Sequence, residues 1–487
     1  MKKESEEKRI EQAKKISVRE ASAYSLMDGF GLRYITPFAN SMGASNTIIG
    51  FLTSIPSLLG NLVQLISIKT MEKHSRQKIV FWSVLLQAVM WIALVFLGAG
   101  FFLFNLSSKQ ASALLVIIYT LLIVFGAFAG PAWSSWMKDL ITKNKGTYFG
   151  RRSMIAGLLA LIFMFIAGFI LDYFRGTRIF VAFVILFSLA FLGRFISAAL
   201  FLKQYEPKLK LNEGYYFSFR QFLKKLPFNN FGRFTIFMGL INFSTAIASP
   251  FFAVYLLEDL RLKSIQSGYI FYTIIIMASS VTTLIFMTWW GRFADKYGNY
   301  KVMKATGYFV PLIPAFWLIS YFMLGNISIF YIVIFLLFGE AISGVIWGGF
   351  NLSAGNYIYD AVTRERMALC VSYMGVINGA GVFLGAILGG IIASIDFVFL
   401  GFPTLFWVFI ISLVARFIII RIMIPKIREV RENLIQGDLK KEIECELKRA
   451  IRKDEKVLGK SIKKFHLSNF LSAIQNKLVK PRPSEMS

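Results

Sequence analysis

The feature that most constrains this chain is a series of long apolar runs separated by short polar breaks. A helix needs about 20 mainly apolar residues to cross a hydrocarbon core of about 30 Å. Runs of this kind lie at 20–42, 46–68, 79–104, 110–136, 150–172, 178–202, 233–257, 266–290, 302–324, 327–350, 367–394 and 399–424. The sequence therefore predicts an all-α polytopic membrane protein with twelve transmembrane helices.

The longest interior polar stretch divides these runs into two sets of six. We expect two six-helix bundles around a central cavity, at 20–202 and 233–424, joined by a central loop at 203–232. A charged N-terminal tail at 1–19 precedes them, and a basic C-terminal tail at 425–487 follows. The two sets also resemble each other, since Arg194 near the end of span six has a counterpart in Arg416 of span twelve. A structural repeat predicts a substrate site between the bundles. Chance similarity among apolar segments is the alternative explanation.

The net charge of +27 would suggest a nucleic-acid partner in a soluble protein. Here the basic residues gather in the two tails and in the breaks after even-numbered spans, with few after odd-numbered spans. Positive residues near span ends favour the cytoplasm. We therefore expect both termini to be cytoplasmic, in the cell membrane, with lipid and a small molecule as partners and no nucleic acid. We also expect a monomer.

The cysteine and histidine content limits the chemistry. The chain has two cysteines, Cys370 and Cys445, and two histidines, His74 and His466. These are too few for a disulfide framework or a metal cluster. No nucleotide-binding loop or catalytic constellation is found. We expect no cofactor, no metal and no enzymatic activity, and residues 1–20 do not resemble a cleavable signal peptide.

Between spans eight and nine the chain reads GRFADKYGNYK, from Gly291 to Lys301. This stretch resembles the G-x-x-x-D-[RK]-x-G-x-x-[KR] signature of the major facilitator superfamily, which lies in the cytoplasmic loop between the second and third helices of a six-helix half. The residues of the motif would form a cytoplasmic gate: Gly291 for close helix approach, Asp295 as an acceptor, Gly298 for the turn, with Arg292, Lys296 and Lys301.

The matching loop of the first half keeps part of the motif. It has Glu72, Lys73 and Lys78 but lacks the glycines. The sequence therefore gives little support for a second, equivalent gate in the first half. Further charges flank the predicted cytoplasmic loops and could exchange partners with Glu72 and Asp295 as the halves move: Asp139, Arg151, Arg152, Asp360, Arg364 and Arg366. Simple interfacial charge is the alternative.

Ionisable residues inside spans are candidates for the mechanism because they cost free energy unless they are paired or face water. Asp28 and Arg33 lie in span one and Glu340 in span ten. The resemblance implies that spans one, four, seven and ten line the cavity, so these three side chains would share one aqueous pocket. Asp28 and Arg33 are about 140° apart around a helix, which makes them poor mutual partners. A structural ion pair of Arg33 with Glu340 is the alternative.

Other polar and aromatic residues on the presumed cavity helices are weaker candidates for substrate contact, each of which can equally be packing: Asn40, Thr120, Trp133, Asn242 and Trp347. Arg194 and Arg416 are expected to be structural, snorkelling toward headgroups or bracing a loop. The glycines of span eleven, among them Gly381 and Gly385, predict a close helix–helix contact.

These features favour a secondary transporter that works by alternating access, with proton coupling through Asp28 and Glu340. The rivals are an uncoupled or sodium-coupled carrier of the same fold, a membrane-embedded enzyme acting on lipids or isoprenoids, and a receptor or assembly factor that transports nothing.

Overall fold

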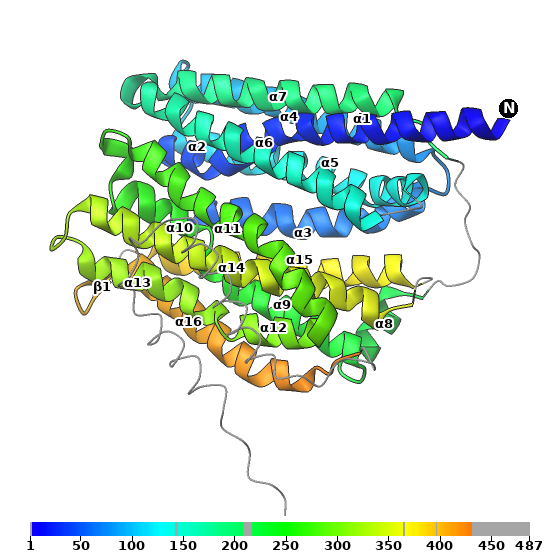
Figure 1. Cartoon of the computed structure of the whole chain (residues 1–487). Helices are drawn as coiled ribbons and strands as arrows, with labels where there is room; N and C mark the ends of the chain where they lie inside the picture. Colours follow the sequence, from blue (N-terminus) through cyan, green and yellow to red (C-terminus); the bar gives the residue numbers. More distant parts are fainter. Residues whose placement is uncertain (1, 142–144, 208–216, 364–365, 396, 431–487) are drawn as a thin grey trace, which may run out of the picture. The chain divides into compact units, whose positions relative to one another are not determined.

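A computed structural model describes residues 2–141, 145–207, 217–363, 366–395 and 397–430. The first half of the chain forms a bundle of long helices, drawn in blue to turquoise in Figure 1. Its elements are α1 (Lys2–Phe30), the 3-10 turn η1 (Leu32–Tyr34), α2 (Ile35–Ser41), α3 (Asn46–Thr70), α4 (Arg76–Phe102), α5 (Ser108–Leu140), α6 (Lys145–Tyr173), the 3-10 turn η2 (Gly176–Arg178) and α7 (Ile179–Lys203).

The second half repeats this plan. A short helix, α8 (Phe219–Lys225), lies in the predicted central loop. The bundle then contains α9 (Asn230–Ala248), α10 (Phe251–Val254), the π-helical turn η3 (Tyr255–Asp259), the 3-10 turn η4 (Leu262–Ser264), α11 (Gly268–Tyr297), α12 (Asn299–Gly307), the 3-10 turn η5 (Val310–Leu312), α13 (Ile313–Met323), α14 (Ile329–Ala361), α15 (Met367–Ser394), α16 (Thr404–Met423) and the 3-10 turn η6 (Ile424–Lys426).

The helix pairings of the first half recur in the second. In the first, α1 packs on α6 and α7, and α5 packs on α3 and α4. In the second, α9 packs on α15 and α16, and α14 packs on α11 and α12. This recurrence agrees with a structural repeat, and the predicted fold of twelve spans in two six-helix bundles is confirmed.

Among the described residues, eleven helices are long and apolar enough to cross a membrane. The first predicted span is not one of them because its apolar residues are divided among α1, η1 and α2. The expected start of span twelve at residue 399 is also wrong. A small antiparallel hairpin of β1 (Val398–Phe399) and β2 (Phe402–Pro403) precedes α16, with the Gly401 backbone at a positive φ in its turn.

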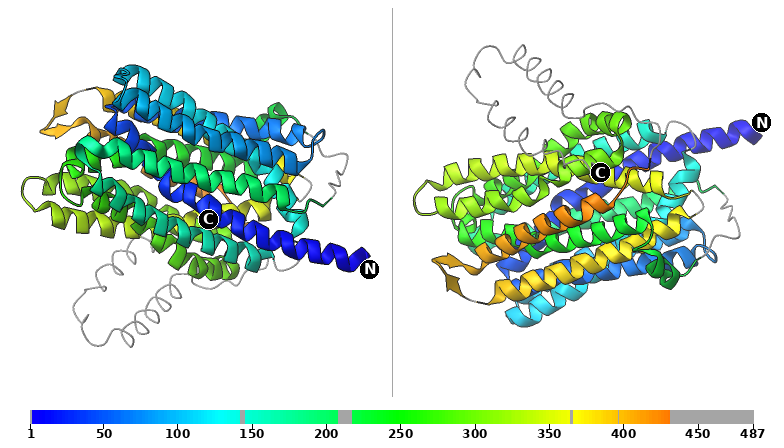
Figure 2. Two further views of the ribbon diagram at one scale, coloured as in Figure 1. Left: turned by 90° about the horizontal axis from the view of Figure 1, so that it is seen from above. Right: turned by 90° about the horizontal axis from the view of Figure 1, so that it is seen from below.

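The two ends of the bundle differ in how the halves meet. We call the end that holds the start of α1, the α3–α4 turn and Gly298 the terminal face, and the end that holds the α2–α3 turn, α10 and the hairpin the opposite face (Figures 1 and 2). Among the described residues, three helix pairs make the main contacts between the halves: α3 with α15, α6 with α11, and α2 with α10.

Buried side chains show the same difference. The largest hydrophobic cluster combines both halves at the opposite face, with Phe38 and Phe183 from the first half and Phe251 and Tyr255 from the second. Toward the terminal face, each half has a cluster of its own, one that contains Trp136 and another that contains Phe350, and a small cluster around Tyr373 is contacted by Leu65 of α3. The halves are therefore sealed together at the opposite face.

The glycines of α15 lie at close helix contacts, as predicted. A Cβ atom added at Gly381 would lie 2.1 Å from the Gly239 carbonyl oxygen, and one at Gly385 would lie 2.1 Å from that of Phe243. Both carbonyls belong to α9. Hydrogen at these positions lets the α15 and α9 backbones touch, which is how small residues bring membrane helices together.

Candidate functional site

The Asp28 and Arg33 side chains form an ion pair where α1 ends. Arg33 Nε lies 3.7 Å from Asp28 Oδ1, and the two side chains are 27% and 49% exposed for Asp28 and Arg33 respectively. The expectation that they are poor partners is wrong because it assumed one continuous helix. The α-helix stops at Phe30, and the 3-10 turn that follows rotates Arg33 back toward Asp28. Glycine at position 31 lets the Trp91 ring pack against this break, since a Cβ there would lie 2.3 Å from the ring.

Four tyrosines lie within electrostatic reach of Arg33: Tyr24, Tyr34, Tyr119 and Tyr272. They come from α1, η1, α5 and α11, so both halves contribute. The Tyr272 hydroxyl donates to the Arg33 carbonyl oxygen at 3.4 Å, and its ring lies 6.4 Å from that of Tyr34. Side chains of both bundles therefore border the pair. These tyrosines were not predicted from the sequence, although Tyr119 adjoins the candidate Thr120.

Glu340 belongs to a second polar centre. It is half-buried on α14, and the groups that act on it are the Trp317 indole and the Arg416 guanidinium. Among the described residues it forms no ion pair with Arg33. Arg416 is 1% exposed, and its Nη atoms reach the Val310 and Thr245 carbonyl oxygens at 3.5 and 3.4 Å while its Nε has no partner. Its positive charge is thus poorly compensated, and Glu340 is the acidic group near it.

Arg194 is the counterpart of Arg416 in the first half. Its Nε donates to Gln87 Oε1 at 2.6 Å, and its Nη1 lies 3.7 Å from Glu20 Oε1. Glu20 also binds Arg152 at 2.7 Å. Neither arginine snorkels as expected, because each is buried against the first and third spans of its own bundle. Both hold a bundle together from within.

The weaker candidates differ in whether their polar groups and rings are already engaged by neighbouring residues. Trp133 lies under the Arg152 guanidinium at 4.7 Å, and Trp347 packs edge-on against Phe350 at 5.5 Å. Asn242 donates to the carbonyl oxygen of Met238 in the preceding turn. Thr120 is buried with an unpartnered hydroxyl, and Asn40 is half-buried on α2. Trp133 and Trp347 are thus committed to packing, while Thr120 keeps a free hydroxyl.

The motif at the terminal face is folded as a turn between α11 and α12. Gly298 has φ +96°, a conformation that favours glycine. Asp295 and Arg292 are exposed, and within the described part of the chain neither forms an ion pair. Gly291 does not provide the close approach we expected, because a Cβ there would lie 3.9 Å from Leu352. Lys296 lies over the Tyr297 ring at 5.3 Å, and Lys301 is half-buried.

Arg76 organises the corresponding turn of the first half. Its guanidinium is fully buried and binds Asp139 at 2.6 Å, Glu206 at 3.2 Å and the Pro207 carbonyl oxygen at 2.7 Å. Glu206 also accepts from the backbone N–H groups of Arg76 and Gln77, and so caps α4. The predicted counterparts Glu72, Lys73 and Lys78 are exposed. The charged residues expected at this turn are therefore not the ones that hold it together.

The second half contains a version of the same junction in which a neutral amide replaces the guanidinium. Asn299, in the place of Arg76, donates to Asp360 at 2.6 Å, and Glu429 accepts from the Tyr300 backbone N–H at 3.0 Å. Asp139 and Asp360 are thus committed within their own bundles. Arg151 and Arg366 are exposed, and Arg364 lies outside the described residues.

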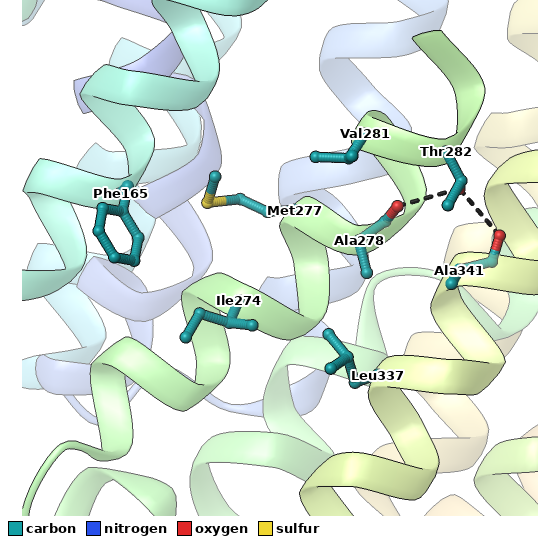
Figure 3. Close-up of a pocket in the computed structure, with 8 residues that line it drawn as sticks. All are labelled: Phe165, Ile274, Met277, Ala278, Val281, Thr282, Leu337 and Ala341. Atoms are coloured by element: carbon teal, nitrogen blue, oxygen red, sulfur yellow. Dashed lines mark hydrogen bonds between the residues drawn. The ribbon is translucent and has the colours of Figure 1, made fainter. Parts of the chain in front are cut away.

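An apolar groove lies between the halves, lined by residues of α11 other than Tyr272 and Thr273, which contact η1. Its volume is about 370 Å³, and Figure 3 shows its lining from α6, α11 and α14: Phe165, Ile274, Met277, Ala278, Val281, Thr282, Leu337 and Ala341. The Thr282 hydroxyl turns away to the carbonyl oxygens of Ala278 and Ala341, at 3.0 and 2.8 Å. The groove offers no free polar group among the residues that line it, so it is unsuited to a polar substrate.

The match to a protein-family model identifies the family of the chain. The model described as Major Facilitator Superfamily matches residues 21–351 and 236–474. The chain belongs to the major facilitator superfamily. It is therefore a multi-pass membrane transporter, and the predicted family is confirmed. No curated protein matches the chain.

Solved structures of transporters share the fold at low sequence identity. A mutant of nucleoside transporter NupG is 15% identical with a TM-score of 0.64, over 85% of this chain and 100% of that one. A bacterial homologue of the iron transporter ferroportin, in an inward-facing state, is 12% identical with a TM-score of 0.56, over 85% and 98%. A bacterial homologue of the human lysosomal transporter Spinster is 16% identical with a TM-score of 0.50, over 79% and 82%.

Proposed function

We propose that this chain is a secondary active transporter that binds a small molecule at the Asp28–Arg33 pair and moves it by alternating access. The pair is the observation that carries the proposal, since it is a partly exposed ion pair within a span, surrounded by tyrosines of both bundles. Ionisable groups at such depth mark substrate or ion pathways. Because the pair is electrically neutral, the favoured substrate is polar without a net charge, and the aromatic rings can stack on a flat part of it.

We infer that the conformation is open toward the terminal face. In support, the hydrophobic cluster at the opposite face combines both halves, whereas each half has its own cluster toward the terminal face. Asp295 of the motif is also exposed there. With the basic tails in the cytoplasm, this is an inward-open carrier of the cell membrane, acting as a monomer.

We infer that Glu340 couples transport to a proton. Its carboxyl group is half-buried next to a buried arginine whose charge has long hydrogen bonds and an unpartnered Nε. Protonation and deprotonation of Glu340 change how well that charge is compensated, which alters the packing free energy of the second bundle. Asp28 would bind substrate and Glu340 would respond to the gradient.

Transport by the purified full-length chain in liposomes tests both roles. The panel contains nucleosides, sugars and amino acids as uncharged or zwitterionic compounds, and organic anions and lipophilic cations as charged ones; nucleosides are included because NupG is described as a nucleoside transporter. We expect an uncharged compound to be transported and Asp28→Asn to lower its exchange at least tenfold. Glu340→Gln should keep exchange across the membrane but lose accumulation driven by a pH gradient.

The matched control is Glu258→Gln, which removes a carboxylate at the opposite face that pairs with Lys263. It should leave exchange and accumulation within twofold of the native values. Full exchange by Asp28→Asn would contradict the binding site, and full accumulation by Glu340→Gln would contradict the coupling role.

A further inference from the structure

Asp172 of the first bundle caps a helix of the second. It lies next to the last residue of α6, and its Oδ1 and Oδ2 accept from the backbone N–H groups of Tyr269 and Ile270, each at 3.3 Å. These are the first free donors of α11. The residue before that helix, Ser267, has φ +62° and its side chain makes no cap hydrogen bond. The α11 N-terminus therefore obtains its cap and its compensating negative charge from the other bundle.

The same seam continues for another turn and a half toward the middle of the membrane. A Cβ at Gly168 of α6 would lie 2.7 Å from Thr273 Oγ1, so α6 and α11 are in close contact there. Thr273 Oγ1 shares a hydrogen bond of 3.0 Å with the Tyr34 hydroxyl, which also donates to the Met164 carbonyl oxygen at 2.7 Å. All of these groups lie near the opposite face.

Among the described residues, the matching contact of the second seam is made by neutral groups. There the Asn46 side chain of α3 donates to the Ala393 carbonyl oxygen of α15 at 2.8 Å, and Gly50 packs against Gly390. The repeat makes α3 the counterpart of α11, and α15 the counterpart of α6. In the described part of the chain, a carboxylate cap is thus found at the α6–α11 seam, added to a packing arrangement that both seams share.

We propose that Asp172 is a positioning residue of the transport cycle: its carboxylate is a removable cap that holds the α6–α11 seam, and with it the opposite face, closed. This inference rests on the proposed alternating access. Opening the opposite face separates α6 from α11, which leaves two α11 amide groups without their acceptor. That loss is a penalty of the open state alone, so Asp172 sets how often the open state is visited.

The η1 turn connects this seam to the substrate pair. Arg33 and Tyr34 are neighbours in η1, with Arg33 turned to Asp28 and Tyr34 bound to Thr273 across the bundles. Tyr272, adjacent to Thr273, donates to the Arg33 carbonyl oxygen. A substrate that draws the Arg33 side chain away from Asp28 therefore acts on the segment that holds the seam.

Distances between spin labels on the two bundles test the cap without any substrate. The labels are placed by Phe104→Cys in the first half and Val398→Cys in the second, both exposed at the opposite face, in a background of Cys370→Ser and Cys445→Ser. In the native protein we expect one short distance to dominate. Asp172→Ala should raise the population at longer distance about fivefold, the size of a lost helix cap, with Asp172→Asn intermediate.

Two controls separate the cap from a general loss of stability. Glu258→Gln removes another carboxylate of the same face and should leave the distance distribution unchanged. The unfolding temperature of each variant is measured as well, and a longer distance that appears below the unfolding transition supports the cap. An unchanged distribution in Asp172→Ala overturns the inference, while the transport assays with Asp28→Asn remain valid as an independent test of the function.

Discussion

Replacing Arg76 with alanine is expected to destabilise the protein by about 3 kcal/mol, because the change leaves carboxylates without their buried cation. The Arg76 side chain has no exposed surface and binds Asp139, Glu206 and the Pro207 carbonyl oxygen. These partners come from the end of α5 and from the segment after α7, so one side chain joins three parts of the bundle. Thermal unfolding of the purified protein in detergent measures the loss.

Arg76→Lys and Lys78→Ala provide the comparison for this prediction. Lysine keeps the charge but lacks the planar fork of donors, so Arg76→Lys should recover less than half of the loss. Lys78 is exposed two residues away, and Lys78→Ala should change stability by no more than about 0.5 kcal/mol. Equal unfolding temperatures for Arg76→Ala and Lys78→Ala would show that the buried network contributes nothing.

The hydrophobic pattern was sufficient to predict the fold because lipid imposes strong constraints on it. Each apolar run is long enough to cross the membrane, and the helices found by the structure lie where these runs are. The predicted helix boundaries were wrong at two places, where the sequence stays apolar although the backbone is no longer α-helical. One is the 3-10 turn after Phe30, and the other is the hairpin at Val398–Pro403.

The candidate site could be predicted only in part. Depth in a span identified Asp28, Arg33 and Glu340, since charge in an apolar run is visible in the sequence. The partners of these groups were not predictable, because they depend on the break at Gly31 and on which helices lie opposite. Arg33 accordingly pairs with Asp28 rather than Glu340, and Glu340 is influenced by Arg416.

The structure also separates what is rigid from what moves. Arg194 and Arg416 fasten spans within a bundle, and Arg76 and Asn299 fasten the terminal-face turns. The described contacts between the bundles are the two seams, the α2–α10 contact and the hydrogen bonds of Tyr34 and Tyr272 between η1 and α11. In the described part of the chain, buried polar networks hold each bundle together internally, and packing, neutral hydrogen bonds and the Asp172 cap join the two bundles. Bundles of this kind are suited to moving as rigid bodies.

Gly385→Ala is expected to destabilise the protein by about 3 kcal/mol, at the upper end of the range for overpacking, whereas Gly291→Ala should be neutral or slightly stabilising. The methyl group at 385 would lie 2.1 Å from the Phe243 carbonyl oxygen, so α15 must move away from α9. At 291 it would lie 3.9 Å from the Leu352 side chain, an ordinary contact. Both substitutions add one carbon atom to a helix, so the difference in unfolding temperature measures the helix contact. A loss at Gly291 as large as that at Gly385 would contradict the packing described for the motif.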